Sequence, residues 1–405
     1  MDLQPRGYDK VEQLIDKGVA IPNPRSLDVG DDVDVERISG QGVVLYPGCR
    51  IYGSQTVISA GAKLGAEGPV TIDDCRLGPK VELKGGYFKR SVFLEKANMG
   101  LGAQVREGCL LEEEANGAHC VGLKQTILFP FVTLGSLINF CDCLMAGGTS
   151  RKDHSEVGSS YIHFNFTPDG NKTTASLFGD VPRGVMLNQR PIFLGGQGGA
   201  VGPIRLGYGT VVAAGSTLRE DVLEDGKFVV AGPHPGTERD FVPHTYRNVN
   251  RVVRNNIVYL ANLEALAHWY KKVRQPFFAD QEMGSLVFEG ALEVLSLAKE
   301  ERSKRLIAMA EKVPVSNAAG RQLRGRVAEV CASFSEDPAV SGGEEFLAAL
   351  HLATADSTDD YIQTIQHLTP ELSAMGVQWL QQIVDALCGR AGTLLRSLDL
   401  FCDKR

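Results

Sequence analysis

The chain has 405 residues, of which 43% are hydrophobic and 22% are charged, the ordinary composition of a soluble globular protein. The formal net charge of −7 excludes a general binder of nucleic acid or of anionic membranes, because both need a basic footprint. This length exceeds one compact core and predicts two or three domains. The sequence shows no apolar run of about 18 residues and no signal-peptide core, so we expect no membrane insertion and a cytoplasmic protein with reduced cysteines.

The distribution of glycine divides the chain into two parts. The first 250 residues hold 36 of the 45 glycines, and the rest is rich in Leu, Ala, Glu, Gln and Arg. This change places a boundary near residues 243–250. We predict an N-terminal helix and lead-in over residues 1–40, a repeat domain over 41–247 with an inserted loop at 142–191, and an α-helical domain over 248–405.

The repeat domain carries small or apolar residues at a spacing of six. One series runs Ala97, Ala103, Cys109, Ala115, Val121, Ile127, Thr133 and Asn139, and a second runs in parallel from Met99 to Cys141. A spacing of six contains the two-residue period of a strand, so each hexad can form one short strand and a corner. Tight corners need residues with positive φ, which glycine adopts easily. Six glycines fall at or beside the expected corners: Gly48, Gly53, Gly61, Gly65, Gly102 and Gly108. The pattern predicts a β-solenoid, a parallel β-helix of hexapeptide repeats.

The C-terminal part predicts helices. Apolar residues follow helical spacing over 257–270 and 286–297, Pro276 and Pro314 separate segments, and residues 378–398 add another amphipathic pattern. No chemical motif is visible in this part. Because a β-helix has open ends that need covering, we expect the helices to cap one end.

Two stretches give the repeat domain a likeness to a known family. Residues 18–65, beginning GVAIPNPRSLDVGDDV, and GTVVAAGSTLREDV at 209–222 resemble the acetyltransferase half of the bifunctional N-acetylglucosamine-1-phosphate uridyltransferase/glucosamine-1-phosphate acetyltransferase family. The resemblance extends loosely to residue 225 and implies a left-handed β-helix that forms a homotrimer. Only the short lead-in over 1–40 precedes the repeats, so we expect no uridyltransferase (pyrophosphorylase) activity. The helical part has no counterpart in that family.

The resemblance implies a phosphate site. VREGCLLEEEANGAHCVGLKQTIL at 105–128 runs without gaps along the family's phosphate-binding segment, which places Arg106 and Lys124 at its Arg and Lys. Three hexads separate the two residues, so they should stack one coil apart, about 4.8 Å, and together clamp a phosphate. The alternative is a solvated basic ladder balanced by Glu107 and the acidic residues at 112–114.

The position of a catalytic base depends on the register. The same ungapped register puts Ser136 at the family's catalytic His and Asn139 at its Tyr, which leaves no base. A second register, carried by NFTPDGNKTTASLFGD at 165–180, places Asn165 at an Asn that holds donor and substrate. This register leaves room for one extra hexad, which contains His154. Acetyl transfer to an amine needs a base with a pKa near 7, and His154 is the candidate for that base.

Other readings of the histidines stay open. His154 can equally be a loop residue paired with Asp153 or Glu156. His163 alternates with Tyr161 along a strand-like run and is the runner-up base. A metal-dependent hydratase using His119, His154 and His163 as ligands is a weaker alternative, and no metal is firmly implied.

The resemblance also implies an acetyl-CoA site. Ala213 and Ala214 fall at the family's alanine pair, whose backbone contacts the pantetheine arm, and Asn188 falls at an upstream Ser position. The glycine-rich segment LGGQGGAVGP at 194–203 predicts tight corners.

We therefore predict a hexapeptide-repeat acyltransferase that N-acetylates an amino-sugar phosphate or a sugar nucleotide with acetyl-CoA as co-substrate. The alternative is a non-catalytic sugar-nucleotide-binding or scaffold β-helix that has lost its base. The position of His154 distinguishes the two. Facing Arg106 and Lys124 in a cleft between subunits, it supports the enzyme; on an outer loop far from them, it supports the scaffold.

Overall fold

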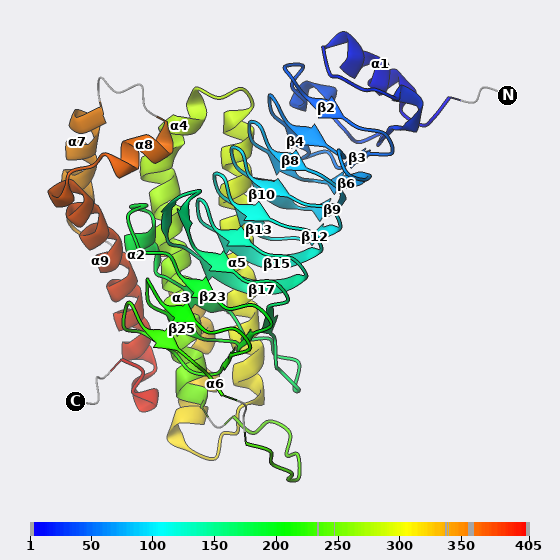
Figure 1. Ribbon diagram of the computed structural model, residues 1–405. Coiled ribbons are helices and arrows are strands. Elements are labelled where there is room, and N and C mark those ends of the chain that lie inside the picture. Colours follow the sequence, from blue (N-terminus) through cyan, green and yellow to red (C-terminus); the bar gives the residue numbers. More distant parts are fainter. Residues whose placement is uncertain are drawn as a thin grey trace.

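The computed structural model describes residues 4–232, 235–246, 248–336, 338, 340–354 and 360–401. Its first part is a left-handed parallel β-helix of hexapeptide repeats, and a helical domain follows (Figure 1). Short strands stack in parallel from one coil to the next and form a three-sided solenoid. The fold class predicted from the six-residue spacing is confirmed.

The three sides are called here face 1, face 2 and face 3, in the order in which each coil visits them. Face 1 contains β1 (Asp28–Val29), β3 (Arg50–Tyr52), β6 (Val70–Asp73), β9 (Gly86–Lys89), β12 (Ala103–Val105), β21 (Ile162–Phe164), β24 (Gly199–Val201) and β27 (Thr217–Leu218). Face 2 contains β4 (Val57–Ile58), β7 (Arg76–Leu77), β10 (Ser91–Phe93), β13 (Cys109–Leu111), β22 (Ser176–Phe178) and β25 (Arg205–Leu206). Face 3 contains β2 (Val44–Leu45), β5 (Lys63–Leu64), β8 (Glu82–Leu83), β11 (Asn98–Met99), β14 (Asn116–Gly117), β16 (Thr133–Leu134), β20 (Glu156–Val157), β23 (Phe193–Leu194), β26 (Val211–Val212) and β28 (Phe228–Val229).

Three corners join these faces. Corner A lies between faces 1 and 2, corner B between faces 2 and 3, and corner C between faces 3 and 1. Two longer strands, β15 (Val121–Leu128) and β17 (Ile138–Met145), bend around corner A and belong to both adjoining faces. The site residues predicted from the sequence lie at or beside these corners.

The corners require left-handed backbone, and glycine provides much of it. The six glycines predicted at or beside corners all have φ between 73° and 94°. Other corners use residues with side chains at φ between 51° and 59°, namely Lys80, Lys96, Glu114, Cys120, Gln125, Leu137 and Asp142. A non-glycine residue in this region is uncommon and strained, so the stacked neighbouring coils must hold it there.

The six-residue series holds through Val121 and then slips by one residue. Gln104 pairs with Gly122, a full three hexads on, but Leu110 pairs with Ile127, which is one position short of three hexads. One residue is therefore missing from corner A of this coil. The buried positions that follow include Thr126, Val132 and Ile138, whereas the predicted Thr133 is half-buried and the predicted Asn139 is exposed.

Two of the expected boundaries differ from the structure. The lead-in over 1–40 already contains a coil, because β1 pairs with β3 and bridges join Ala20 to Val44 and Ile38 to Ile58. Asp28 pairs with Arg50, which lies more than three hexads further along the chain. The first coil therefore does not keep the six-residue spacing, and the hexad pattern does not include it. Ahead of it, α1 (Tyr8–Asp16) packs Val11 and Leu14 against the open end.

The segment 142–191 is not a single inserted loop. Strands β20, β21 and β22 lie within it and continue the three faces. The chain leaves the coil three times instead. It forms a hairpin of β18 (Gly148–Ser150) and β19 (Asp153–His154) at corner B, a loop over 165–175 at corner A, and a loop with the short helix α2 (Val181–Gly184) at corner B.

The helical domain runs along the solenoid. Its helices are α3 (Val249–Trp269), a π-helical turn (Tyr270–Arg274), α4 (Gln275–Ala279), α5 (Gly284–Lys312), α6 (Ala318–Ser333), α7 (Gly343–Thr354), α8 (Tyr361–Gln366) and α9 (Pro370–Leu394). Figure 1 shows α3 and α5 beside the strands with α7 and α9 outside them, so these helices cover a side of the β-helix and not an end as expected. Among the described residues, no helix has the length and apolarity needed to cross a membrane.

Helix α5 packs on face 2 almost parallel to the solenoid axis. Near its start, Gly290 lies under Arg76 of β7, and a Cβ there would be 2.4 Å from the Arg76 side chain. Twelve residues later, Arg302 pairs with Asp142 of β17, four coils on from β7. Twelve helical residues rise about 18 Å, and four coil spacings amount to about 19 Å. The two distances match, which explains how one helix contacts consecutive coils.

Charged groups are buried where the helices meet face 2. Arg274, at the end of the π-helical turn, has a 1% exposed side chain whose Nη1 lies 3.2 Å from Glu112 Oε1. Its guanidinium also pairs with Glu113 and stacks 3.9 Å from the ring centre of Tyr361. Burial raises the pKa of Glu112 to about 7, and Tyr270 donates a 2.5 Å hydrogen bond to it. This cluster fixes the docking of the two domains.

Candidate ligand-binding site at corner A

Arg106 and Lys124 stack one coil apart at corner A. Val105 pairs with Leu123, and the Arg106 amide donates a 2.9 Å hydrogen bond to the Leu123 carbonyl, so the next side chains along each strand are neighbours. Lys124 forms a 2.5 Å ion pair with Glu107. The hydrogen bond from Lys124 lowers the pKa of Glu107. Arg106 and Lys124 therefore stack one coil apart, as predicted. An anion that binds Lys124 has to compete with Glu107.

A pocket of about 360 Å³ opens beside Arg106 and Lys124, within the size range of small-molecule sites. It is enclosed by corner A, by the loop over 165–175 and by α5. Its lining residues are Arg106, Lys124, Gln125, Asn139, Cys141, Asp142, Ile162, His163, Phe164, Asn165, Lys172, Glu301, Arg302 and Arg305. The structure thus brings together three predicted residues, Arg106, Lys124 and Asn165.

Asp142 organises the inner wall of the pocket. It occupies a corner at φ 57° and is buried. Its Oδ1 accepts a 2.6 Å hydrogen bond from Arg302 Nη2, and its Oδ2 accepts a 2.5 Å bond from Asn165 Nδ2. Because each carboxylate oxygen is engaged, Asp142 orients one pocket residue from the helical domain and one from the loop.

His163 lines the pocket but belongs to the core. Its ring packs edge-on against Phe140 and Phe178, each 6.2 Å away between ring centres, and its Nε2 lies 2.7 Å from Ser176 Oγ. Burial lowers the pKa of His163 to about 4. The imidazole is therefore neutral at pH 7 and a poor proton acceptor in that range.

His154 lies at a different corner from Arg106 and Lys124. It sits on the hairpin at corner B, where its Nδ1 is 3.0 Å from the Arg151 carbonyl and its Nε2 is 3.9 Å from Glu156 Oε2. Arg151 anchors the hairpin by donating to the Phe131 carbonyl at 2.9 Å and to Thr133 Oγ1 at 2.8 Å. Within one chain, the predicted base therefore does not face Arg106 and Lys124. The extra residues form a two-stranded excursion and not an extra hexad of the coil.

Corner C holds Ser136, which the ungapped register places at the family's catalytic His. Ser136 Oγ lies 2.9 Å from Nδ1 of His119, which is one coil earlier and exposed. Ala213 and Ala214, which are predicted to bind acetyl-CoA, lie at the same corner further along the solenoid. Their backbone packs against Gly195. The close approach of Gly195 agrees with the prediction of tight corners in the glycine-rich segment.

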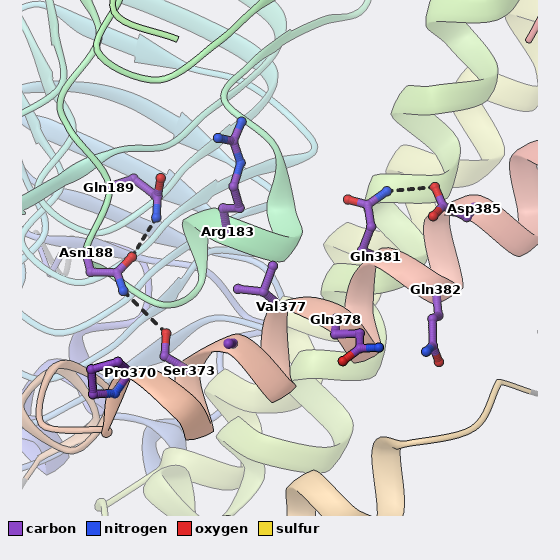
Figure 2. A pocket seen from close by; sticks show the side chains of 11 residues that line it. Arg183, Asn188, Gln189, Pro370, Ser373, Val377, Gln378, Gln381, Gln382 and Asp385 are labelled. Atoms are coloured by element: carbon purple, nitrogen blue, oxygen red, sulfur yellow. Dashed lines mark hydrogen bonds between the residues drawn. The ribbon is translucent and has the colours of Figure 1, made fainter. Parts of the chain in front are cut away.

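Asn188, the third residue predicted to bind acetyl-CoA, lies apart from Ala213 and Ala214. It lies in the loop after α2 at corner B and lines a second pocket of about 680 Å³ between this loop and α9. Asn188 is hydrogen-bonded to Gln189 and to Ser373 of α9 (Figure 2). The bond to Ser373, from Asn188 Nδ2 to Ser373 Oγ, is 3.3 Å long. Asn188 and the alanine pair are thus on opposite edges of face 3.

The histidines proposed as metal ligands do not meet within the chain. His119 lies at corner C, His154 at corner B and His163 at corner A. Over the residues that the structure describes, no group of three or more His, Cys, Asp or Glu side chains could hold a metal ion. The hydratase alternative therefore has no support within a single copy.

Sequence reasoning missed Asp142, Arg302 and Arg305. Asp142 stood between Cys141 and Cys143 in an apolar stretch, and a charge in such a place is itself a signal of a buried partner. Its partner is 160 residues away on α5, whose helical spacing says nothing about which coil it contacts.

The fold and the corner A pocket define a hexapeptide-repeat β-helix with a corner rich in cationic side chains and an appended helical domain. No protein-family model matches the chain. The chain is similar to the bifunctional protein GlmU of Thermotoga maritima, with 25% identity over 217 residues, which is 53% of this chain and 42% of that protein. It is also similar to GlmU of Fervidobacterium nodosum, with 27% identity over 219 residues, 53% of this chain and 42% of that protein.

The predicted resemblance to the acetyltransferase half of that family is confirmed, and the chain spans less than half the length of these relatives. Among solved structures, the UDP-N-acetylglucosamine acyltransferase from Campylobacter jejuni covers 68% of this chain and 93% of its own, with 15% identity and a TM-score of 0.18. LpxA from Acinetobacter baumannii covers 69% and 95%, with 10% identity and a TM-score of 0.19. Both superpositions are loose over the whole chain.

Proposed function

We propose that this protein is a hexapeptide-repeat acyltransferase that binds an amino-sugar phosphate or a sugar nucleotide at corner A and N-acetylates it with acetyl-CoA. The observation that carries the proposal is the convergence of Arg106, Lys124 and Asn165 on one pocket. Two cations one coil apart suit a phosphate. Asn165 lines the same pocket and is held in place by donating its Nδ2 to Asp142.

The reaction requires a base and a donor near the acceptor amine. The amine attacks the thioester carbonyl, a C–N bond forms, the C–S bond breaks, coenzyme A leaves as the thiol, and the base removes the ammonium proton. In one chain, His154 lies at corner B and the Ala213–Ala214 pair lies at corner C. The proposal therefore includes a homotrimer in which a neighbouring copy brings the donor and the base to corner A.

A second candidate is a sugar-nucleotide-binding scaffold without catalysis. Two observations favour it: within one chain His154 lies on a hairpin away from the pocket, and burial lowers the pKa of the pocket's own histidine, His163, to about 4. The two candidates share the ligand site and differ only in turnover.

Calorimetric titration separates binding from turnover. Acetyl-CoA and UDP-N-acetylglucosamine are titrated separately into the protein and into Arg106→Gln, with Arg50→Gln as the control because Arg50 is an exposed arginine of the same face several coils away. We expect Arg106→Gln to weaken only the sugar ligand, by about tenfold. Arg50→Gln should change neither.

Release of the coenzyme A thiol from acetyl-CoA, with glucosamine 1-phosphate or UDP-glucosamine as the acceptor, then decides between the candidates. Thiol release that falls in His154→Gln supports the transferase. Binding of the sugar nucleotide with no thiol release supports the scaffold. Binding of neither ligand refutes both.

A further inference from the structure

The helical domain contributes cationic groups to the corner A pocket. Arg302 and Arg305 are one turn apart on α5 and both line it. The Arg302 side chain is 3% exposed, and its Nη2 is bonded to Asp142. Its Nη1 is buried and has no hydrogen-bond partner. A buried N–H without an acceptor is energetically costly, so an acceptor from a bound ligand would complete this site.

The charges of the pocket are strongly unbalanced. Five cationic side chains line it, against the carboxylates of Asp142 and Glu301, and Glu107, outside the lining, pairs with Lys124. Glu301 is already shared, because its Oε1 is 2.7 Å from Arg305 Nη2 and 3.9 Å from Arg302 Nη2. The cations occupy two walls: Arg106 and Lys124 on the corner, and Arg302 and Arg305 on α5. On the helix wall, Asp142 and Glu301 pair with Arg302 and Arg305, which leaves Arg302 Nη1 as a buried donor without an acceptor.

We propose that Arg302 and Arg305 form a second anion subsite, so that the ligand carries two linked anionic groups, as a nucleoside diphosphate sugar does. This inference rests on the proposed function because it uses the same pocket. One phosphate lies on Arg106 and Lys124. The other accepts hydrogen bonds from Arg302 Nη1 and from Arg305. A sugar monophosphate fills only the corner wall, so the helical domain selects the diphosphate ligand.

The test compares two probes on variants of the full chain without acetyl-CoA, so it does not depend on turnover. UDP-N-acetylglucosamine and N-acetylglucosamine 1-phosphate are titrated into Arg305→Gln, Arg302→Gln and Lys304→Gln. Lys304 is the matched control, because it is an exposed cation on the same helix that does not line the pocket. Arg305 is partly exposed, so its variant should fold even if loss of the buried Arg302 unfolds the protein.

We expect Arg305→Gln to weaken the diphosphate ligand about tenfold and the monophosphate less than twofold. Lys304→Gln should change neither. Equal losses for the two probes in Arg305→Gln, or no loss for either, overturn the second subsite. If Arg106→Gln still weakens both probes in that case, the proposed function stands and this inference alone fails. If the unaltered protein binds neither probe, both fail.

Discussion

Neutral burial of His163 predicts a specific dependence of stability on pH. Burial lowers the pKa of His163 from 6.5 to about 4. Between these two values the unfolded chain binds a proton at this site and the folded protein does not, so the free energy of unfolding rises with pH across this window. The stability is complete above pH 6.5 and is lost as the pH falls toward 4. The difference between the two pKa values corresponds to about 3 kcal/mol.

Glu112 acts in the opposite direction, so the wild-type profile alone does not isolate this effect. Its pKa is raised from 4.5 to about 7 by burial, which makes the folded protein hold a proton that the unfolded chain releases, and stability then falls as pH rises through that range. The measurement is therefore a difference. Urea unfolding of the wild type is compared with His163→Gln and with His163→Phe at pH 7 and pH 4.5, since Glu112 is present in all three proteins and cancels.

The stability advantage of the wild type over each variant should be about 2.4 kcal/mol smaller at pH 4.5 than at pH 7, because pH 4.5 lies between the two pKa values and close to the folded one. Glutamine can keep a hydrogen bond to Ser176 and phenylalanine can keep the ring packing, so a common pH dependence in both belongs to titration of the imidazole. A difference that stays constant between the two pH values would refute the neutral, buried assignment of His163.

Three further outcomes are expected. Arg274→Met should lower the free energy of unfolding by about 3–5 kcal/mol, measured by urea denaturation, because it leaves Glu112 buried without its cation. Gly148→Ala should lower the thermal midpoint, because a Cβ there would lie 2.5 Å from a Cα of β19 at φ 100°, and an unchanged midpoint would contradict this geometry. Glu107→Gln should tighten binding of UDP-N-acetylglucosamine, measured by calorimetry, because it frees Lys124 from its 2.5 Å ion pair; weaker binding would argue against Lys124 as a phosphate ligand.

The repeat was predictable because it is a local pattern. Hexad spacing and corner glycines report backbone geometry residue by residue, and the glycine corners are confirmed by their positive φ. The slip at corner A was not predictable, because Gln125 adopts a left-handed corner without being glycine. Its consequence, a shift by one residue of the inward positions from Thr126 to Ile138, becomes visible only through strand pairing.

The candidate site was predictable on one wall only. Arg106 and Lys124 stack because three hexads make one coil, and that spacing can be read from the sequence. The wall from α5 depends on how a helix docks, which neither apolar spacing nor the family resemblance encodes. The corner at which His154 lies within one chain could not be predicted, because residues 148–154 form a hairpin and counting hexads through a hairpin gives no corner position.

Helix α5 also affects the order in which the parts of the protein should unfold. In a solenoid each coil contacts only its neighbours, so coils can in principle be lost one at a time from an end. Here one rigid helix is in contact with β7, β10 and β13 and is bonded to Asp142 of β17. A coil in this span cannot open without breaking its bond to a helix that several other coils also hold. The middle of the β-helix should therefore unfold as one cooperative block, and the coils beyond the reach of α5 should fray first.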